Sequence, residues 1–268
     1  MFKLTQKVKS ISTRRYLKVA YDSGGRNKPT ISFLHGIVAS STTWRPILDK
    51  IDNNKYRLIT LEMLGFNGSP IPKNCEYDVN DHIKYLRRTI KKLHVKKPFK
   101  IVGHSMGSII AASYANRYRF SISSEYLLSP PVYISEKSLH SKTSYLKNSL
   151  IVKAYETLLE NRKFTINTAQ KLRRMFKTDG LNVTDENWNI FKLCLKNTII
   201  KQNLYKDVRD TILPIYIIYG ALDGFLIEEN IQKLAEFGHV KTTKLLKNDH
   251  RINENYAEEA ARQIKTGF

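Results

Sequence analysis

Cysteines and long apolar runs are both scarce in this chain of 268 residues. The two cysteines, Cys75 and Cys194, lie far apart and lack Cys-x-x-Cys spacing, so we expect neither a disulfide framework nor a zinc site. No apolar stretch approaches the roughly 20 residues of a membrane-spanning helix. The basic start MFKLTQKVKS is not followed by the apolar run of a signal peptide. These absences predict a cytoplasmic protein with reduced thiols.

Acidic residues are also few, because 24 Asp and Glu stand against 45 Lys and Arg, which gives a net charge of +21. Such a charge favours weak attraction to anionic surfaces and carries no information about the fold. No nucleic-acid-binding motif is present, so specific nucleic-acid binding is not expected. The stretch 84–100 has eight basic residues and no acid, and a solvated helix face is its simplest interpretation.

The chain does contain a regular alternation of strand and helix patterns. An antiparallel strand is predicted at 15–21 and a short buried strand at 30–36. Further strands are predicted at 56–63, 99–105, 123–133 (with a stop at Pro130 and Pro131), 214–223 and 240–246. Helices are predicted at 78–94, 107–118, 228–237 and 252–265, and Thr42 or Thr43 is expected to cap a further helix. This alternation predicts an α/β fold with a mostly parallel central sheet and helices on both faces.

One long segment does not follow this alternation. Residues 134–206 have helical patterns without a convincing buried strand. We therefore predict a core formed by 1–133 and 207–268, with 134–206 inserted as a helical cap, or lid, over one end of the sheet. Aromatic residues of this segment are candidates to line a substrate pocket or simply to pack the cap helices together: Tyr145, Tyr155, Phe164, Phe176, Trp188 and Phe191.

The strongest motif is GHSMG at 103–107, which has the form Gly-x-Ser-x-Gly. It follows a predicted strand and precedes a predicted helix, which is the setting that a nucleophilic serine on a sharp turn requires. Gly103 and Gly107 remove side chains that would clash where the chain doubles back. The backbone N–H of Met106 would then point to where an oxyanion forms. The motif predicts that Ser105 is a nucleophile.

With these residues, the chain resembles the α/β-hydrolase family over nearly its whole length. FLHG at 33–36 resembles the family's His-Gly oxyanion segment, GHSMGS its nucleophile turn, and YGALDGF at 219–225 its acid loop. The resemblance implies that the N–H of Ile37 is the second oxyanion donor and that the triad follows the order Ser, acid, His. Families with an aspartate nucleophile are disfavoured, because position 105 is Ser.

The position of each histidine relative to the strands selects the base. Of the seven histidines, only His239 and His250 follow the acid loop. Catalytic groups of open parallel sheets gather at the carboxyl ends of the strands. His239 precedes the last predicted strand and His250 follows it, so we predict His250 as the general base.

The same reasoning selects Asp223, which follows the strand at 214–219. Asp249 is adjacent to His250, and neighbouring side chains seldom face each other. Glu228 is a weaker alternative for orienting the imidazole. We therefore predict a Ser105–His250–Asp223 triad, without a metal or an organic cofactor.

The loop LEMLGFNGSP at 61–70 resembles the family's Asp-x-x-Gly-x-Gly-x-Ser loop, with two departures. Glu62 stands where Asp is usual, and Asn67 stands where the second Gly is usual. Asn tolerates positive φ better than most residues, so the turn can survive. The departures leave the triad intact and place the geometry of this loop in question.

The triad predicts a serine hydrolase of the carboxylesterase type, which cleaves a small-molecule ester through an acyl-enzyme. Two alternatives remain at this level. One is hydrolysis of a carbon–carbon bond in a ring-cleavage product, although Arg251 and Ile252 follow His250 where such enzymes often carry Trp. The other is a ligand-binding protein with little turnover, because a fold does not fix a function. The sequence does not identify the substrate-binding residues.

Overall fold

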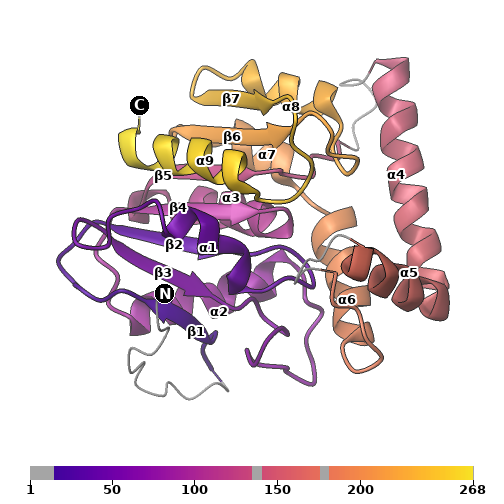
Figure 1. Cartoon of the computed structure of the whole chain (residues 1–268), viewed down its shortest axis with the longest axis horizontal. Helices are drawn as coiled ribbons and strands as arrows, with labels where there is room; N and C mark the ends of the chain where they lie inside the picture. Colours follow the sequence, from indigo (N-terminus) through magenta and orange to yellow (C-terminus); the bar gives the residue numbers. More distant parts are fainter. Residues whose placement is uncertain (1–14, 135–140, 176–180, 268) are drawn as a thin grey trace.

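The computed structural model describes residues 15–134, 141–175 and 181–267. Its centre is a seven-stranded sheet in the order β1-β3-β2-β4-β5-β6-β7 (Figure 1). Strand β1 pairs antiparallel with β3, and all the other pairs are parallel. The strands are β1 (Val19–Asp22), β2 (Thr30–Leu34), β3 (Arg57–Leu61), β4 (Phe99–His104), β5 (Ile122–Leu128), β6 (Ile215–Gly220) and β7 (Val240–Leu245). The α/β fold predicted from the alternation is confirmed.

Helices cover both faces of this sheet (Figure 1). On one face lie α1 (Arg45–Leu48) and α9 (Glu254–Thr266), which contact each other. On the other face lie α2 (Val79–Lys92), α3 (Met106–Arg117), α7 (Leu204–Arg209) and α8 (Glu228–Ala235). Crossovers between parallel strands are almost always right-handed. The face on which a crossover helix packs therefore depends on the direction in which the chain moves across the sheet.

The alternation of side chains along the strands divides the apolar core into two layers. In β6, Tyr216 and Ile218 join the cluster under α1 and α9, whereas Ile215 and Ile217 join the cluster under α2 and α3. Successive residues of a strand point to opposite faces, so a strand buried on both faces is apolar throughout.

A side-chain cap marks the start of α2, whereas the cap predicted after β2 lies at another residue. Helix α2 begins after Asp78, whose side chain accepts a hydrogen bond from Asp81 N. The prediction that Thr42 or Thr43 caps the helix after β2 is wrong. Ser40 accepts from Thr42 N and caps a short 3-10 turn, η1 (Ser41–Trp44), which leads into α1. The capping oxygen therefore lies two residues earlier than the sequence pattern suggested.

Between β5 and α7 the described residues form helices α4 (Lys142–Glu160), α5 (Arg162–Met175) and α6 (Trp188–Cys194), followed by a π-helical turn, η4 (Leu195–Ile200). These helices lie together to one side of the sheet (Figure 1). Their buried side chains Ile166, Trp188 and Phe191 belong to the same apolar cluster as the core under α2 and α3. Within the described ranges, no helix has the length and apolar character needed to cross a membrane.

Candidate active site

Ser105 lies in the turn between β4 and α3 with φ 54° and ψ −122°. A positive φ is rare for a residue with a side chain and costs about 1–3 kcal/mol, so the surrounding structure must hold it. Two hydrogen bonds do so: Ser105 N donates to Leu128 O at 2.9 Å, and Ser108 Oγ donates to Gly103 O at 2.8 Å. The serine that the motif predicted as a nucleophile therefore occupies a strained and well-braced turn.

The two glycines of the motif allow this turn. A Cβ on Gly103 would lie 2.3 Å from Gly107 O, and a Cβ on Gly107 would lie 2.0 Å from Leu34 O. Both contacts are with backbone atoms, which cannot move aside without displacing β2 or α3. The close approach of β2, β4 and α3 at this point thus requires glycine at both positions.

His250 and Asp223 come together beside this turn. His250 follows β7 and Asp223 follows β6, and the two strands are adjacent in the sheet. His250 Nδ1 lies 2.7 Å from Asp223 Oδ2, and the carboxylate side chain is fully buried whereas the imidazole is 23% exposed. Because Nδ1 faces the carboxylate, Nε2 is the ring nitrogen left for another partner.

Two residues whose contact with His250 the sequence did not predict, His104 and Phe225, also hold His250 in place. His104 Nε2 donates to His250 O at 2.8 Å. Burial, followed by the charge of His250, lowers the pKa of His104 to about 3, so its imidazole is neutral. The Phe225 ring packs edge-on against the His250 ring at 5.0 Å between centroids. The His104 contact joins residues 146 positions apart and leaves no local signal in the sequence.

The residues predicted to bind an oxyanion lie on both sides of Ser105. A Cβ on Gly36 would lie 3.5 Å from Ser105 Oγ, so the segment before Ile37 passes directly beside the nucleophile. In the described part of the chain, neither the Ile37 N–H nor the Met106 N–H donates a hydrogen bond to a protein acceptor. Nor does Ser105 Oγ hydrogen-bond to His250 among these residues, a contact that often tightens only when substrate binds.

The alternative acids and bases have other partners. Asp249 pairs with Arg251 at 2.6 Å, and Glu228 pairs with Lys244 at 2.7 Å. His239 Nε2 donates to Val208 O at 2.9 Å, at the opposite end of β7 from His250. The structure therefore brings Asp223, and none of these groups, to His250.

Most of the aromatic residues between β5 and α7 with described side chains pack against other protein groups. Trp188 and Phe191 are buried against each other, and the Tyr155 hydroxyl hydrogen-bonds to that of Tyr133 at 2.9 Å. Phe164 is 59% exposed, and Phe176 lies outside the described residues. Packing of the helices between β5 and α7 thus accounts for Trp188 and Phe191.

A cavity of about 500 Å³ lies between α4 and the loops that follow β6. Its lining includes Asp223, Leu226, Glu228 and Lys147, and Lys147 comes from α4. Helix α4 therefore borders the loop that carries Asp223. Across the described residues, no group of three or more His, Cys, Asp or Glu side chains could hold a metal ion.

A family comparison agrees with this architecture, because the family described as alpha/beta hydrolase fold matches residues 29–254. The chain belongs to the α/β-hydrolase family. Among solved structures, a hydrolase from Oleispira antarctica superposes with a TM-score of 0.75 at 17% identity and covers 96% of this chain and 97% of its own. An esterase from Exiguobacterium antarcticum gives 0.71 at 17% identity over 94% and 95% of the two chains. A haloalkane dehalogenase from Bradyrhizobium elkanii is also similar, at 15% identity, so these likenesses show the fold alone.

Curated relatives match this α/β-hydrolase over shorter stretches. The probable lysophospholipase BODYGUARD 4 of Arabidopsis thaliana is 33% identical over 106 residues, which is 39% of this chain and 25% of that protein. The monoacylglycerol lipase ABHD6 of Homo sapiens is 31% identical over 113 residues, or 41% of this chain and 33% of that protein. The matched stretch thus spans only a quarter to a third of these relatives.

Proposed function

We propose that this α/β-hydrolase is a serine hydrolase that cleaves carboxylic esters through Ser105, His250 and Asp223. The observation that carries the proposal is the 2.7 Å contact between His250 Nδ1 and the buried carboxylate of Asp223. It fixes the imidazole tautomer and leaves Nε2 for the serine on the neighbouring turn. A serine hydroxyl is a poor nucleophile until such a base takes its proton.

The reaction then proceeds in two halves. Ser105 Oγ attacks the ester carbonyl while His250 Nε2 takes the hydroxyl proton, and the same nitrogen returns that proton to the leaving alcohol. Asp223 stabilises the imidazolium that forms between these steps. A water molecule, activated by His250 in the same way, cleaves the acyl-enzyme and releases the acid. No metal or organic cofactor takes part in this scheme.

The developing oxyanion is bound by the backbone N–H groups of Ile37 and Met106. Both groups are without a protein acceptor in the described structure and lie next to Ser105 in the chain or in space. Donors fixed in advance toward a developing charge contribute about 3–4 kcal/mol each to transition-state stabilisation. The first turn of α3 adds its positive dipole end at the same place.

For the substrate, we propose a glycerol ester with a single acyl chain, bound between the core and a cap formed by 134–206. The named activities of the curated relatives, lysophospholipase and monoacylglycerol lipase, support this class. The cap position is supported by α4, whose Lys147 borders the cavity beside Asp223. A cytoplasmic location stays a prediction.

An active-site-directed fluorophosphonate probe tests the catalytic proposal. We expect the wild-type protein to be labelled and Ser105→Ala to remain unlabelled, because the probe reacts only with an activated serine. Absence of labelling in a folded wild type, or equal labelling of the two proteins, would refute the proposal and favour a ligand-binding role.

Substrate class is tested separately with single-chain acylglycerols and p-nitrophenyl esters of graded length. We expect turnover of the single-chain glycerol esters to exceed that of diacylglycerols. A labelled enzyme that hydrolyses a dienoic ring-cleavage product but no ester would instead establish the carbon–carbon hydrolase alternative.

A further inference from the structure

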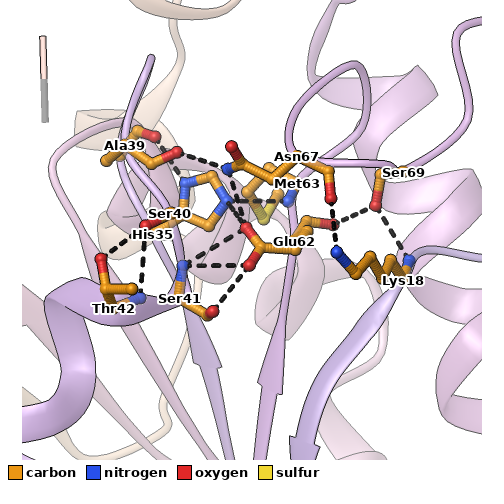
Figure 2. A network of polar contacts seen from close by, with 11 residues as sticks. Lys18, His35, Ala39, Ser40, Ser41, Thr42, Glu62, Met63, Asn67 and Ser69 are labelled. Carbon is orange, nitrogen blue, oxygen red and sulfur yellow. Dashed lines mark hydrogen bonds and ion pairs between the residues drawn. The ribbon is translucent and has the colours of Figure 1, made fainter. Parts of the chain in front are cut away.

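The two residues that depart from the family loop, Glu62 and Asn67, contact each other in the structure. Asn67 Nδ2 donates to Glu62 Oε2 at 2.9 Å (Figure 2). Glu62 is only 4% exposed, whereas Asn67 lies at the surface with φ 49°. Asn adopts this left-handed conformation more easily than most residues with a side chain, so position 67 can carry an amide without losing the turn.

Glu62 is the centre of a polar network (Figure 2). Its Oε1 accepts from Ser41 Oγ at 2.6 Å, and its Oε2 lies 3.1 Å from His35 Nε2. Burial opposes ionisation of Glu62, but the contact with His35 and the hydrogen bonds from Ser41 and Asn67 outweigh it and hold the pKa of the carboxyl below its usual value. Glu62 is therefore an anion at neutral pH, and its hydrogen bonds from Ser41 and Asn67 are charge-assisted.

The network surrounds one short segment, the loop 36–41, which leads from β2 into the first residue of η1 and contains Ile37. Asn67 Nδ2 donates to Ala39 O at 2.7 Å, and the Glu62 carboxylate binds both the hydroxyl and the N–H of Ser41. At the other end of the loop, His35 Nδ1 donates to Gly36 O at 2.7 Å. Together these contacts restrain the loop at Gly36, Ala39 and Ser41.

The loop needs such support because its backbone is strained. Val38 has φ 46°, an uncommon conformation for a β-branched residue that persists only where neighbouring contacts impose it. Its carbonyl accepts from Asn182 N, in the segment before α6, at 3.2 Å. Strain at Val38 would relax if the contacts at Ala39 and Ser41 were lost, and the adjacent Ile37 N–H would turn with it.

We propose that Glu62 and Asn67 are a coupled pair of positioning residues that hold the loop 36–41, and with it the Ile37 N–H, in the geometry for oxyanion binding. The proposal rests on the ester hydrolysis proposed above. The two residues act together because Asn67 Nδ2 links the Glu62 carboxylate to Ala39 O, so that either residue alone leaves one end of the link open. Among the described residues neither Glu62 nor Asn67 hydrogen-bonds to Ser105, so both act through the loop.

Four variants test this pair: E62Q, E62D, N67G and the double variant E62D/N67G. We expect E62Q and N67G each to lower kcat on a p-nitrophenyl ester by roughly tenfold with little change in KM, which is well short of the about 100-fold loss for an oxyanion donor itself. The double variant restores the residue types of the usual family loop. The fold loss of kcat in E62D/N67G should therefore be at least about threefold smaller than the product of the fold losses in E62D and N67G alone.

A tetrahedral transition-state analogue, a trifluoromethyl ketone, gives a readout that a merely structural role would not change. Its affinity should fall in parallel with kcat, whereas KM for the ester stays near the wild-type value. Lys18→Ala is the matched control, because Lys18 Nζ donates to the Asn67 carbonyl at 2.9 Å and not to the side-chain network. We expect this control to retain wild-type kcat.

N67G keeps the test decisive even if E62Q does not fold, since glycine adopts φ 49° without strain. Any of three results would overturn the coupled pair. They are wild-type kcat in a folded N67G, equal losses of kcat in N67G and Lys18→Ala, or a loss in E62D/N67G equal to the product of the two single losses. These outcomes are distinct from failure of the proposed function, which appears as an unlabelled wild-type protein before any of these variants is compared.

Discussion

At the scale of single residues, the proposed chemistry depends on which nitrogen of His250 carries the proton. The Asp223 carboxylate accepts from Nδ1 at 2.7 Å and also accepts from Phe225 N through its other oxygen at 3.0 Å. Full burial of this side chain means that no solvent competes for either contact. The orientation of the imidazole is therefore set by one buried acceptor.

We expect Asp223→Asn to lower kcat/KM on a p-nitrophenyl ester by about 10³-fold or more. The amide would donate to Nδ1 and force the imidazole proton onto Nε2, where it cannot accept the serine proton. Asp249→Asn is the control, because Asp249 is also adjacent to His250 in sequence but pairs with Arg251. A loss of similar size in both variants would contradict the assignment of Asp223 as the orienting acid.

At the scale of elements, the junction of β2, β4 and α3 is the least tolerant part of the fold. The strands and the helix approach so closely at Gly103 and Gly107 that no Cβ fits between backbone atoms. Overpacking in a rigid core usually costs about 1–3 kcal/mol, and a clash with backbone on both sides costs more.

We expect Gly107→Ala to reduce the free energy of unfolding by at least about 3 kcal/mol or to prevent folding. Gly238→Ala is the matched control, since nothing lies within 4 Å of a Cβ at that position. Urea denaturation followed by circular dichroism measures both. Equal stability of the two variants would show that the junction relaxes more easily than its packing indicates.

Strand β5 contains a buried carboxyl group, Glu125, that should make the stability of the fold depend on pH. Glu125 is fully buried, and neither of its carboxylate oxygens has a hydrogen-bond partner in the described chain. Burial, and then the negative charge of Asp207 on α7, raises its pKa well above the ordinary value of 4.5. Because the folded-state pKa is raised, the contribution of Glu125 to stability is fully present below pH 4.5 and is lost as the pH rises through the folded-state pKa.

We therefore expect the wild type to lose more stability than Glu125→Gln as the pH is raised from about 4.5, with a difference in slope of up to about 1.4 kcal/mol per pH unit. Urea denaturation at a series of pH values measures the difference. Glu229→Gln is a control of opposite sign, because a hydrogen bond from Lys147 lowers the pKa of Glu229. Parallel pH profiles for wild type and Glu125→Gln would show that this carboxyl is ionised in the folded protein.

At the scale of the whole molecule, the net charge of +21 is the feature that local structure does not explain. Exposed basic residues occur on α2, at Lys84, Arg88 and Lys91, and on α5, at Lys163, Lys171 and Arg174. Exposed positive charge thus occurs on two separate helices, which favours non-specific attraction to anionic surfaces.

We expect the protein to bind vesicles that contain anionic phospholipid at low salt and to release them as the ionic strength rises. Reversal of Lys84, Arg88 and Lys91 to Glu, or of Lys163, Lys171 and Arg174 to Glu, should weaken binding to a similar extent. Vesicle co-sedimentation measures this, with zwitterionic vesicles as the control. Loss of binding in only one of the two triple variants would instead identify a specific docking face.

The sequence by itself determined the features that depend on neighbouring residues. The parallel sheet followed from alternating strand and helix periods, and the turn at Ser105 followed from two glycines at the required spacing, because sterics of a sharp turn act over only a few residues. Strand ends, together with the order Ser, acid, His that the family resemblance implies, were enough to predict Asp223 and His250 as partners, since parallel strands bring their carboxyl ends to one edge. The N-cap of η1 was missed because several neighbouring hydroxyls satisfy the same local pattern.

Only the tertiary structure decided which distant side chains meet. The hydrogen bond from His104 to His250 and the network that joins Glu62, Asn67 and Ser41 connect segments whose proximity depends on the order of the strands in the sheet. In the sequence, Glu62 and Asn67 were two unexplained departures from a family loop. In the fold they form one contact, because β3 lies beside β2 and brings the buried carboxylate under the loop that contains Ile37.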